Sequence, residues 1–315
     1  MHPTEKAVYI YGPVLSRRLG FSLGIDLVTH KICSFDCIYC QLGKTTDLTL
    51  ERKVYLPPEI IIQQVKDAVA NNKRIDYLTF SGSGEPTLNS KIGYIIAEIK
   101  KFTDIPVAVL TNGSLLFRID VQDDLLNADL VLPTLCAVTE ETMQKINCFH
   151  KDLTAKKIIQ GLIDFNKKYH GKIWLEFMLI KGINDTPAEL EKMKRAIAQI
   201  KPDKVQLNTV VRPPSEKSAI PLSIEELTKI KDYLGAGCEI IAEFAASGST
   251  TSMIDKQGLI LDMIKRRPVT LDDISNSLGL QRQETLNYVD RLKQEAKILS
   301  MKHKGKTYYR AITDK

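Results

Sequence analysis

The stretch Lys31-Ile-Cys-Ser-Phe-Asp-Cys-Ile-Tyr-Cys-Gln41 places three cysteines, Cys33, Cys37 and Cys40, within eight positions. Thiolates are the usual protein ligands of iron–sulfur clusters. Three of them leave one iron of a [4Fe–4S] cube without a protein ligand, much as catalytic zinc sites keep one position open. The C-x3-C-x2-C spacing therefore predicts a cluster with an open iron. A zinc site, which favours C-x2-C pairs and a fourth ligand, and chance clustering are the alternatives.

Short apolar runs alternate with amphipathic runs on both sides of this cysteine loop, over residues 1–244. Strands are expected at Phe21–Leu27, Tyr77–Ser81, Val107–Thr111, Leu130–Leu135, Ile173–Ile180 and Lys204–Asn208. Helices are expected at Pro57–Asn72, Lys91–Phe102, Ala155–Tyr169, Pro187–Ile200 and Ile224–Leu234, with Thr186 and Ser223 as N-caps. Six successive βα units predict an α/β fold in which a parallel sheet forms a full or partial (β/α)6 barrel of the TIM type. Right-handed crossovers gather the loops that follow the strands, including the cysteine loop, at one end.

The last part of the chain has a different pattern. Residues 245–252 are small and polar, which predicts a linker between a barrel domain at 1–244 and a second domain at 253–315. Helices are expected at Met253–Lys265, Leu271–Leu278 and Gln283–Ala296. Strands at Ile298–His303 and Thr307–Ala311 flank a turn at Lys304-Gly305-Lys306. Three helices followed by a β-hairpin predict a winged helix-turn-helix.

Composition limits the class of protein. Hydrophobic residues make up 43% and charged residues 26% of the 315 residues, as in ordinary globular proteins. The chain opens without a secretory signal pattern and has no apolar run long enough for a membrane helix, so a cytoplasmic protein without membrane partners is expected. The net charge is +6, and residues 251–315 supply +5 of it. A basic C-terminal region points to a polyanionic partner.

Two further motifs follow the second and third expected strands. Ser81-Gly-Ser-Gly-Glu-Pro86 combines small residues, which let a ligand approach the backbone, with a carboxylate that can accept a hydrogen bond from an ammonium group. Thr111-Asn-Gly113 ends the third strand and has the composition of a polar turn. Each stands where an active-site loop of the barrel is expected.

Together these motifs resemble the radical S-adenosylmethionine (SAM) superfamily, through the cysteine spacing, the aromatic Tyr39 and the likeness to a Gly-Gly-Glu-Pro motif, with Ser83 in place of a glycine. The resemblance implies that SAM chelates the open iron, that an electron from the cluster cleaves it, and that the resulting 5′-deoxyadenosyl radical takes a hydrogen atom from the substrate. It also implies an electron donor such as flavodoxin or ferredoxin. The cofactor contacts expected are Tyr39, Gly82, Ser83, Gly84, Glu85, Thr111 and Asn112.

Within the superfamily, the chain resembles one branch more closely, the branch that includes the tRNA wyosine-forming enzymes. The likeness lies in Gly12–Gly20 and in Gln41-Leu-Gly-Lys-Thr-Thr46. Those enzymes carry further cysteines upstream, and this chain has none before Cys33, which argues against wyosine synthesis itself. Arg17 and Arg18 are candidates for binding a phosphate or carboxylate, or are solvated surface residues.

Polar residues inside apolar strands are further candidates, because burial costs them free energy unless they find partners. Glu176 with Met178, and Gln206 with Asn208, are expected to face the cofactor pocket or to be satisfied in the core. Cys136 stands where the family often has an aspartate, and is a candidate hydrogen-atom donor. With Cys148 and Cys238 it is also a candidate ligand of an auxiliary cluster. A buried, inert thiol is the simpler alternative.

Three functions remain open from the sequence. The first is radical modification of RNA, tRNA bases in particular, and the second is radical modification of a protein or peptide. The third is a DNA-binding regulator whose cluster senses redox state. Within the expected winged helix, base-reading positions are Gln281, Arg282, Gln283 and Asn287, and phosphate contacts are Lys302, Lys304 and Lys306.

Overall fold

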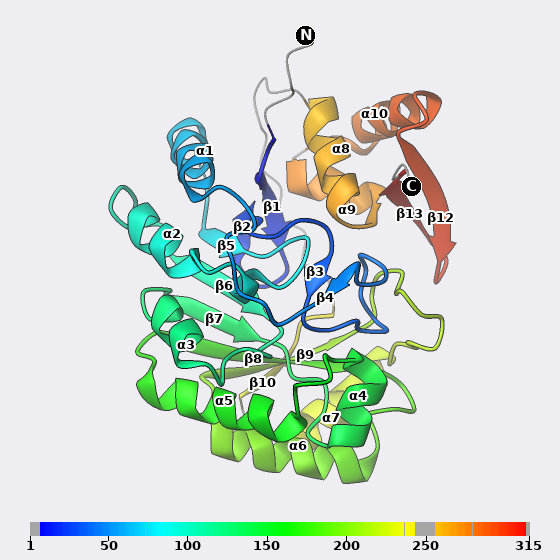
Figure 1. Cartoon of the computed structure of the whole chain (residues 1–315). Coiled ribbons are helices and arrows are strands. Elements are labelled where there is room, and N and C mark those ends of the chain that lie inside the picture. Colours follow the sequence, from blue (N-terminus) through cyan, green and yellow to red (C-terminus); the bar gives the residue numbers. More distant parts are fainter. Residues whose placement is uncertain (1–6, 73, 236, 243–255, 279, 313–315) are drawn as a thin grey trace.

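The computed structural model describes residues 7–72, 74–235, 237–242, 256–278 and 280–312 (Figure 1). Its main sheet has eight strands in the order β1-β2-β5-β6-β7-β8-β9-β10. The seven strands from β2 to β10 run parallel, and β1 pairs antiparallel with β2. The helices α1 to α7 lie along the outside of this curved sheet (Figure 1). The fold is thus the expected α/β partial barrel, with an additional strand at each edge.

The elements of the barrel agree closely with the apolar and amphipathic runs. Its strands are β1 Ile10–Ser16, β2 Gly20–Ile25, β5 Tyr77–Phe80, β6 Val107–Thr111, β7 Leu130–Pro133, β8 Lys172–Leu179, β9 Lys204–Thr209 and β10 Cys238–Ile240. The helices are α1 Pro58–Asn71, α2 Ile92–Ile99, α3 Ile119–Leu125, α4 Glu140–Asn147, α5 Ala155–Lys168, α6 Pro187–Ile200 and α7 Ile224–Leu234, with a 3-10 turn, η1, at Pro86–Leu88. Two short strands, β3 Ile32–Cys33 and β4 Asp47–Leu48, pair in the cysteine loop.

Local chemistry explains where the helices begin. The Thr186 hydroxyl accepts a hydrogen bond from the backbone N–H of Glu189, and Ser223 forms a reciprocal capping box with Glu226. Both expected N-caps are confirmed. The apolar side chains of the helices pack against the sheet in one large core, whose members include Ile61 of α1, Phe165 of α5 and Phe177 of β8.

The barrel is open between its edge strands β1 and β10. The turn between β1 and β2 crosses this opening, because Arg17 Nη1 donates to the carbonyl oxygen of Ile241, just after β10, at 3.1 Å. The same nitrogen donates to Asn208 Oδ1 on β9 at 3.2 Å. The two sides of the opening are therefore joined by a side chain and not by a strand ladder.

The C-terminal elements form a second cluster, which we call the C-terminal unit. They are α8 Lys256–Arg266, β11 Val269–Thr270, α9 Leu271–Leu278, α10 Arg282–Gln294, β12 Ile298–His303 and β13 Lys306–Ala311. The three strands form an antiparallel sheet in the order β11-β13-β12. Lys304 and Gly305, both at positive φ, form a two-residue hairpin turn, one residue shorter than the expected Lys304-Gly305-Lys306, because Lys306 already pairs with His303. The expected linker at 245–252 lies outside the described residues.

The C-terminal unit lies against the open side of the barrel, where α8 and α9 adjoin β1 (Figure 1). Val14 of β1 belongs to the apolar core of the unit, together with Ile260, Val269 and Ile274. Tyr308 Oη donates to the carbonyl oxygen of Val211, after β9, at 2.7 Å. The unit therefore covers the gap between β1 and the last barrel strands. None of the helices in the described part of the chain combines the length and the apolar character needed to cross a membrane.

Candidate functional site

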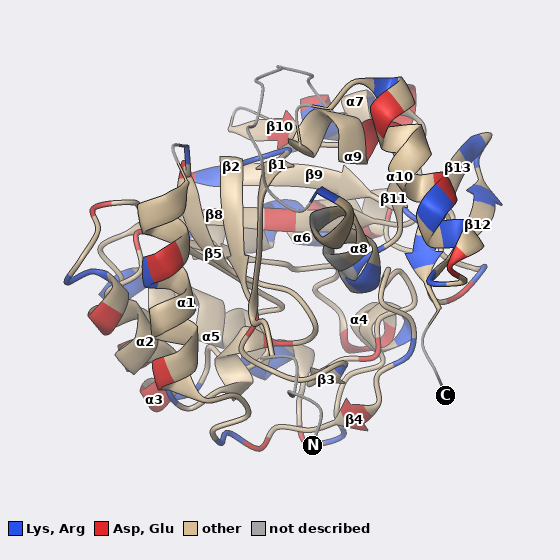
Figure 2. Ribbon diagram, turned by 90° about the horizontal axis from the view of Figure 1, so that it is seen from above, with Lys and Arg blue, Asp and Glu red and all other residues tan. Residues whose placement is uncertain are grey.

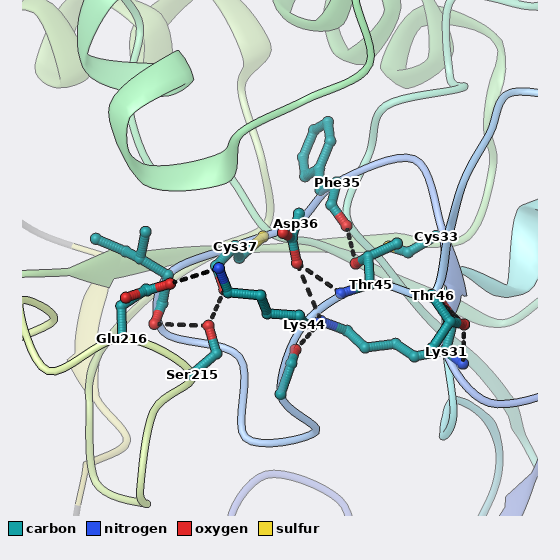
Figure 3. A network of polar contacts seen from close by, with 12 residues as sticks. Lys31, Cys33, Phe35, Asp36, Cys37, Lys44, Thr45, Thr46, Ser215 and Glu216 are labelled. Atoms are coloured by element: carbon teal, nitrogen blue, oxygen red, sulfur yellow. Dashed lines mark hydrogen bonds and ion pairs between the residues drawn. The ribbon is translucent and has the colours of Figure 1, made fainter. Parts of the chain in front are cut away.

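The cysteine loop between β2 and α1 is held by polar contacts to its own backbone (Figure 3). The Thr45 N–H donates to Asp36 Oδ1 and its hydroxyl donates to the Phe35 carbonyl, both at 2.7 Å. The buried ammonium of Lys31 donates to the Gly43 carbonyl oxygen. From the opposite side, Ser215 Oγ donates to the Cys37 carbonyl oxygen at 3.2 Å. The loop is thus ordered by the chain itself.

The three thiols of this loop face one cavity but have different neighbours. Asn112 Nδ2 lies 3.5 Å from Cys33 Sγ, and Asn147 Nδ2 lies 3.2 Å from Cys37 Sγ. Burial, followed by the charge of Glu85, raises the pKa of Cys33 to about 12, and burial also raises the pKa of Cys37. A bound metal deprotonates such thiols, so loading the site releases protons.

Glu85 is buried beside the cysteines and accepts hydrogen bonds through both carboxylate oxygens. Oε1 accepts from the Thr87 N–H at 3.1 Å, the Thr87 hydroxyl at 2.6 Å and the Thr111 hydroxyl at 2.7 Å. Oε2 accepts from the Asn112 N–H at 2.7 Å. Burial raises the pKa of this carboxyl, and the hydrogen bonds from Asn112 and Thr87 oppose the rise. The motifs after β5 and β6 therefore meet at one carboxylate.

The glycines of the same motif are required by close approach. A Cβ on Gly84 would overlap the carbonyl oxygen of Ile32, which accepts from the Glu85 N–H at 3.0 Å. Gly82 has φ +139°, and a Cβ there would overlap the Asp26 carboxylate. Asp26 in turn accepts from the Ser83 N–H at 2.6 Å and from the Ser83 hydroxyl at 2.9 Å. This bond explains why a serine is accommodated where the family motif has a glycine.

These residues line a cavity of about 340 Å³, which we call the central cavity. Its lining includes Cys33, Cys37, Tyr39, Cys40, Gly82, Gly84, Glu85, Thr111, Asn112, Thr134, Glu176, Met178 and Asn208. Among the described residues, no three His, Cys, Asp or Glu side chains converge on a point where they could hold a single metal ion. Three cysteine thiols that line one cavity are the donor set of an iron–sulfur cluster with one open iron. The donor set and the glycine-bounded cavity thus fit a cluster with an adjacent cofactor.

The far wall of the central cavity carries a buried ion pair. Arg18, in the turn between β1 and β2, pairs with Glu176 of β8, and Asn208 Nδ2 of β9 donates to Glu176 Oε1 at 2.7 Å. Burial alone would raise the pKa of Glu176, but Arg18, Asn208 and Arg17 outweigh burial and hold its pKa below the usual value. Glu176 is therefore a charged, fully engaged group of the wall.

Three of the residues expected at the site do not line the central cavity. Ser83 turns toward Asp26, and Gln206 donates to Glu239 of β10 at 2.7 Å. Gln206 shares a strand face with Asn208 and pairs in register with Glu176, which does line the cavity, but its side chain turns to Glu239 on the neighbouring strand. Cys136 lies in a small apolar cluster behind Cys37, 3.3 Å from Tyr39 Oη and 3.4 Å from Asn147 Nδ2. Burial raises the pKa of this thiol to about 11.

Other residues at the site have no signal in the sequence. Arg212, after β9, and Arg267, after α8, line the central cavity although neither belongs to a motif. Asp26 contacts Ser83, and Asn147 contacts Cys37. The partners in each pair are far apart in the sequence, so only the fold brings them together.

Comparison with known proteins assigns the chain. The sequence model of the Radical SAM superfamily matches residues 27–197, which contain the cysteine loop and the strands from β5 to β8. The chain belongs to the radical SAM superfamily. As a member, it is an enzyme that uses a [4Fe–4S] cluster and SAM.

Its relatives extend the likeness over most of the chain. A UPF0026 protein of Methanocaldococcus jannaschii is 36% identical, over 95% of this chain and 94% of its own length. A Brachyspira hyodysenteriae protein named GTPase Obg is 40% identical over 93% of this chain, but this chain spans only 44% of that protein. A protein of Aquifex aeolicus, named a probable dual-specificity RNA methyltransferase RlmN, is 24% identical over 74% of this chain and 72% of its own.

Solved structures show the same fold at low identity. A radical SAM methyltransferase from Sphaerobacter thermophilus has a TM-score of 0.56 and 16% identity, covering 70% of this chain and 65% of the other. Streptococcus suis SuiB bound to SAM has a TM-score of 0.52 and 13% identity, covering 70% of this chain and 52% of its own. Both support the partial barrel of this radical SAM enzyme.

Proposed function

We propose that this radical SAM enzyme modifies RNA, with a tRNA base as its target. The observation that carries the proposal is a second cavity of about 570 Å³, which we call the outer cavity. Lys304 and Lys306 of the β12–β13 hairpin line it together with Arg17 and Arg212 of the barrel. Phosphates of a nucleic acid that contact such a hairpin would bring their neighbouring nucleotides to the mouth of the barrel.

The cofactor roles follow from the central cavity. Cys33, Cys37 and Cys40 hold the cluster in this proposal, while Tyr39, Gly82, Gly84, Glu85 and Asn112 surround SAM. When bound, these groups supply a radical that abstracts a hydrogen atom from the substrate. The buried carboxylate of Glu85, already oriented by Thr87, Thr111 and Asn112, is suited to accept from the SAM ammonium group.

We also propose that residues 1–244 and 253–315 act as two domains, the second being a winged helix. The order helix–strand–helix–helix–strand–strand supports this reading. In α10, Arg282, Gln283 and Asn287 are exposed, as base-reading residues require. Lys and Arg residues also gather along β12 and β13 (Figure 2). Arg282 pairs with Asp272 at 3.3 Å, but both side chains are 72% exposed, so the pair costs little to break.

Two considerations favour RNA over the alternatives. One relative of this chain carries the name of an RNA methyltransferase, which supports an RNA substrate. The four cations that line the outer cavity face one carboxylate, Asp273, among its described lining residues, which suits a polyanion better than most peptides. A peptide substrate is the second candidate, because the same cavity would also hold acidic side chains. A redox regulator would not need the SAM contacts of the central cavity.

Binding and activity together test the proposal. The anaerobically reconstituted protein is expected to form 5′-deoxyadenosine from SAM and a reductant, and to bind tRNA with an affinity that falls steeply with salt. Lys304→Gln and Lys306→Gln should each lower the slope of log affinity against log salt by about one. Lys192→Gln, an exposed lysine on α6, is the matched control. A protein that forms 5′-deoxyadenosine but binds acidic peptides more tightly than tRNA contradicts the RNA proposal.

A further inference from the structure

Arginines from three distant segments converge between the barrel and the C-terminal unit. Arg17 comes from the turn between β1 and β2, Arg212 from the loop after β9, and Arg267 from the residues after α8. All three line the central cavity, and Arg17 and Arg212 line the outer cavity as well. The cluster therefore stands where the two cavities meet. At about 570 Å³, the outer cavity has the size of an ordinary small-molecule site.

The charges of this cluster are incompletely matched by the chain. Arg17 donates to an amide oxygen, on Asn208, and to the carbonyl of Ile241, neither of which carries a charge. The buried Nε of Arg212 has no hydrogen-bond partner among the described residues. Buried donors are nearly always paired, so the Arg212 guanidinium retains a donor for which the described residues supply no acceptor.

Two carboxylates face the cluster, and each is already engaged. Glu176 pairs with Arg18, and Asp273 accepts from the Thr270 N–H at 2.9 Å. Burial, together with the positive charge of Arg18, lowers the pKa of Arg17 to about 10. Burial and the charges of Arg267 and Arg17 lower the pKa of Arg212. An anion bound among the three would oppose both shifts, because it adds to the negative charge that Glu176 and Asp273 already supply.

We propose that Arg17, Arg212 and Arg267 bind a phosphate group of the substrate at the junction of the two cavities. Guanidinium groups present planar pairs of donors that match phosphate oxygens, and several of them together suit a phosphate ester. Arg17 and Arg212 also line the outer cavity, whose described lining includes none of Cys33, Cys37, Cys40, Gly84 or Glu85, so these two arginines reach a side away from the cofactor motifs. Arg267 joins them from the central cavity. The proposed RNA substrate matters here only for which molecule carries the phosphate. That molecule is a nucleic acid strand or a free nucleotide.

Binding of uridine monophosphate, compared with uridine, isolates the phosphate without an adenosine that would compete with SAM. The reconstituted full chain is titrated with each, and with total tRNA, in the presence of SAM. Arg212→Gln and Arg267→Gln are each expected to weaken binding of the monophosphate about tenfold and to leave uridine unchanged. Arg212→Lys keeps the positive charge but loses the planar pair of guanidinium donors, so an intermediate loss of affinity for the monophosphate is expected. Arg195→Gln, 72% exposed on α6 and paired with Glu191, is the control.

Each outcome decides the proposal. A tRNA affinity whose salt slope falls by about one in both arginine variants supports a phosphate on RNA. If the arginine variants lose binding of the monophosphate, and neither the unaltered protein nor any variant binds tRNA, the phosphate site is supported and RNA is removed as its carrier. Equal affinities for uridine and its monophosphate, or arginine variants that bind both like the control, overturn the site. Weaker SAM binding with unchanged monophosphate binding also overturns it, because the arginines would then serve the SAM carboxylate. Urea unfolding of each variant checks that it is folded.

Discussion

Arg18 and Glu176, 158 positions apart, form an ion pair across the open side of the barrel. The side chains are 13% and 7% exposed, so water contributes little to their solvation. Arg18 reaches Glu176 from the β1–β2 turn, and Asn208 holds the other carboxylate oxygen. The strand β1 and the turn after it thereby form part of the wall of the central cavity, so β1 is more than an edge added to the sheet.

Arg18→Gln should destabilise the protein by about 3–5 kcal/mol at pH 7, because it leaves the Glu176 carboxylate buried without its partner. The double variant with Glu176→Gln should recover much of this loss. Urea unfolding of the three proteins measures both effects. The folded pKa of Glu176 is lowered, so the stability from this pair is complete above the ordinary glutamate pKa and is lost as the pH falls through the lowered value. A deficit in Arg18→Gln that does not shrink in acid would contradict this assignment.

Replacing any one of Cys33, Cys37 and Cys40 by alanine should reduce iron from about four per chain to near zero after reconstitution. The reason is that two thiols cannot retain a cluster that has an open iron. Iron analysis and the visible absorbance of the cluster give the result. Cys238→Ala, on β10, is the control and should keep its iron. Full iron in a Cys33→Ala protein would show that another residue completes the ligand set.

Gly84→Ala should impair cluster assembly, because its Cβ would displace Ile32 and with it the adjacent Cys33. Gly93→Ala on α2 is a matched control, since its Cβ would meet Asp124, which is not among the residues that line the central cavity. Both variants are expected to lose about 1–3 kcal/mol of stability from overpacking. When the two variants have lost a similar free energy of unfolding, only Gly84→Ala should also bind less iron. Equal iron contents in the two proteins would argue against the coupling of the two loops.

Cys136→Ala should keep its iron and form 5′-deoxyadenosine at an unchanged rate. The thiol is buried behind Cys37 and is not among the residues that line the central cavity. Loss of product formation from the natural substrate, with the rate of SAM cleavage retained, would instead restore the role of hydrogen-atom donor expected from the sequence.

Tyr308→Phe should loosen the C-terminal unit from the barrel. The change leaves the Val211 carbonyl without its donor, at a cost of about 1–3 kcal/mol if that oxygen stays dry. Hydrogen exchange at the amides of β11 and β13 should become faster, while exchange in β6 and β7 is unchanged. Faster exchange throughout the barrel would mean that the bond supports the whole fold and not the contact between the two parts.

Local patterns in the sequence account for most of the barrel. Val107–Thr111, Pro187–Ile200 and Ile224–Leu234 occur with the expected bounds, since apolar periodicity and caps are properties of neighbouring residues. The strand β1 was not expected, because Gly12 and Pro13 interrupt its pattern and its partner runs antiparallel. The three-residue strand β10 and the short helices α3 and α4 also lacked a sufficient pattern.

The candidate site divides in the same way. The cysteine loop and the residues around Glu85 are contiguous motifs, so the sequence alone points to them. The arginines are different, because Arg212 and Arg267 belong to unrelated loops and become neighbours only when the C-terminal unit packs on β1. Gln206 shows the converse, since strand alternation predicts which face of the sheet it shares with Asn208, but not that its side chain bonds Glu239 of the adjacent strand.

The packing of Val14 into the core of the C-terminal unit has a consequence for synthesis on the ribosome. The strands of the barrel emerge first, and the residues from 256 to 312 follow at about 5–20 residues per second. For several seconds, therefore, the nascent barrel presents an apolar edge that its own later sequence will cover. A chain that pauses in this interval is a client for a chaperone or a candidate for mispairing at β1. Slow codons near the start of α8 should accordingly lower the yield of folded protein more than slow codons after β13.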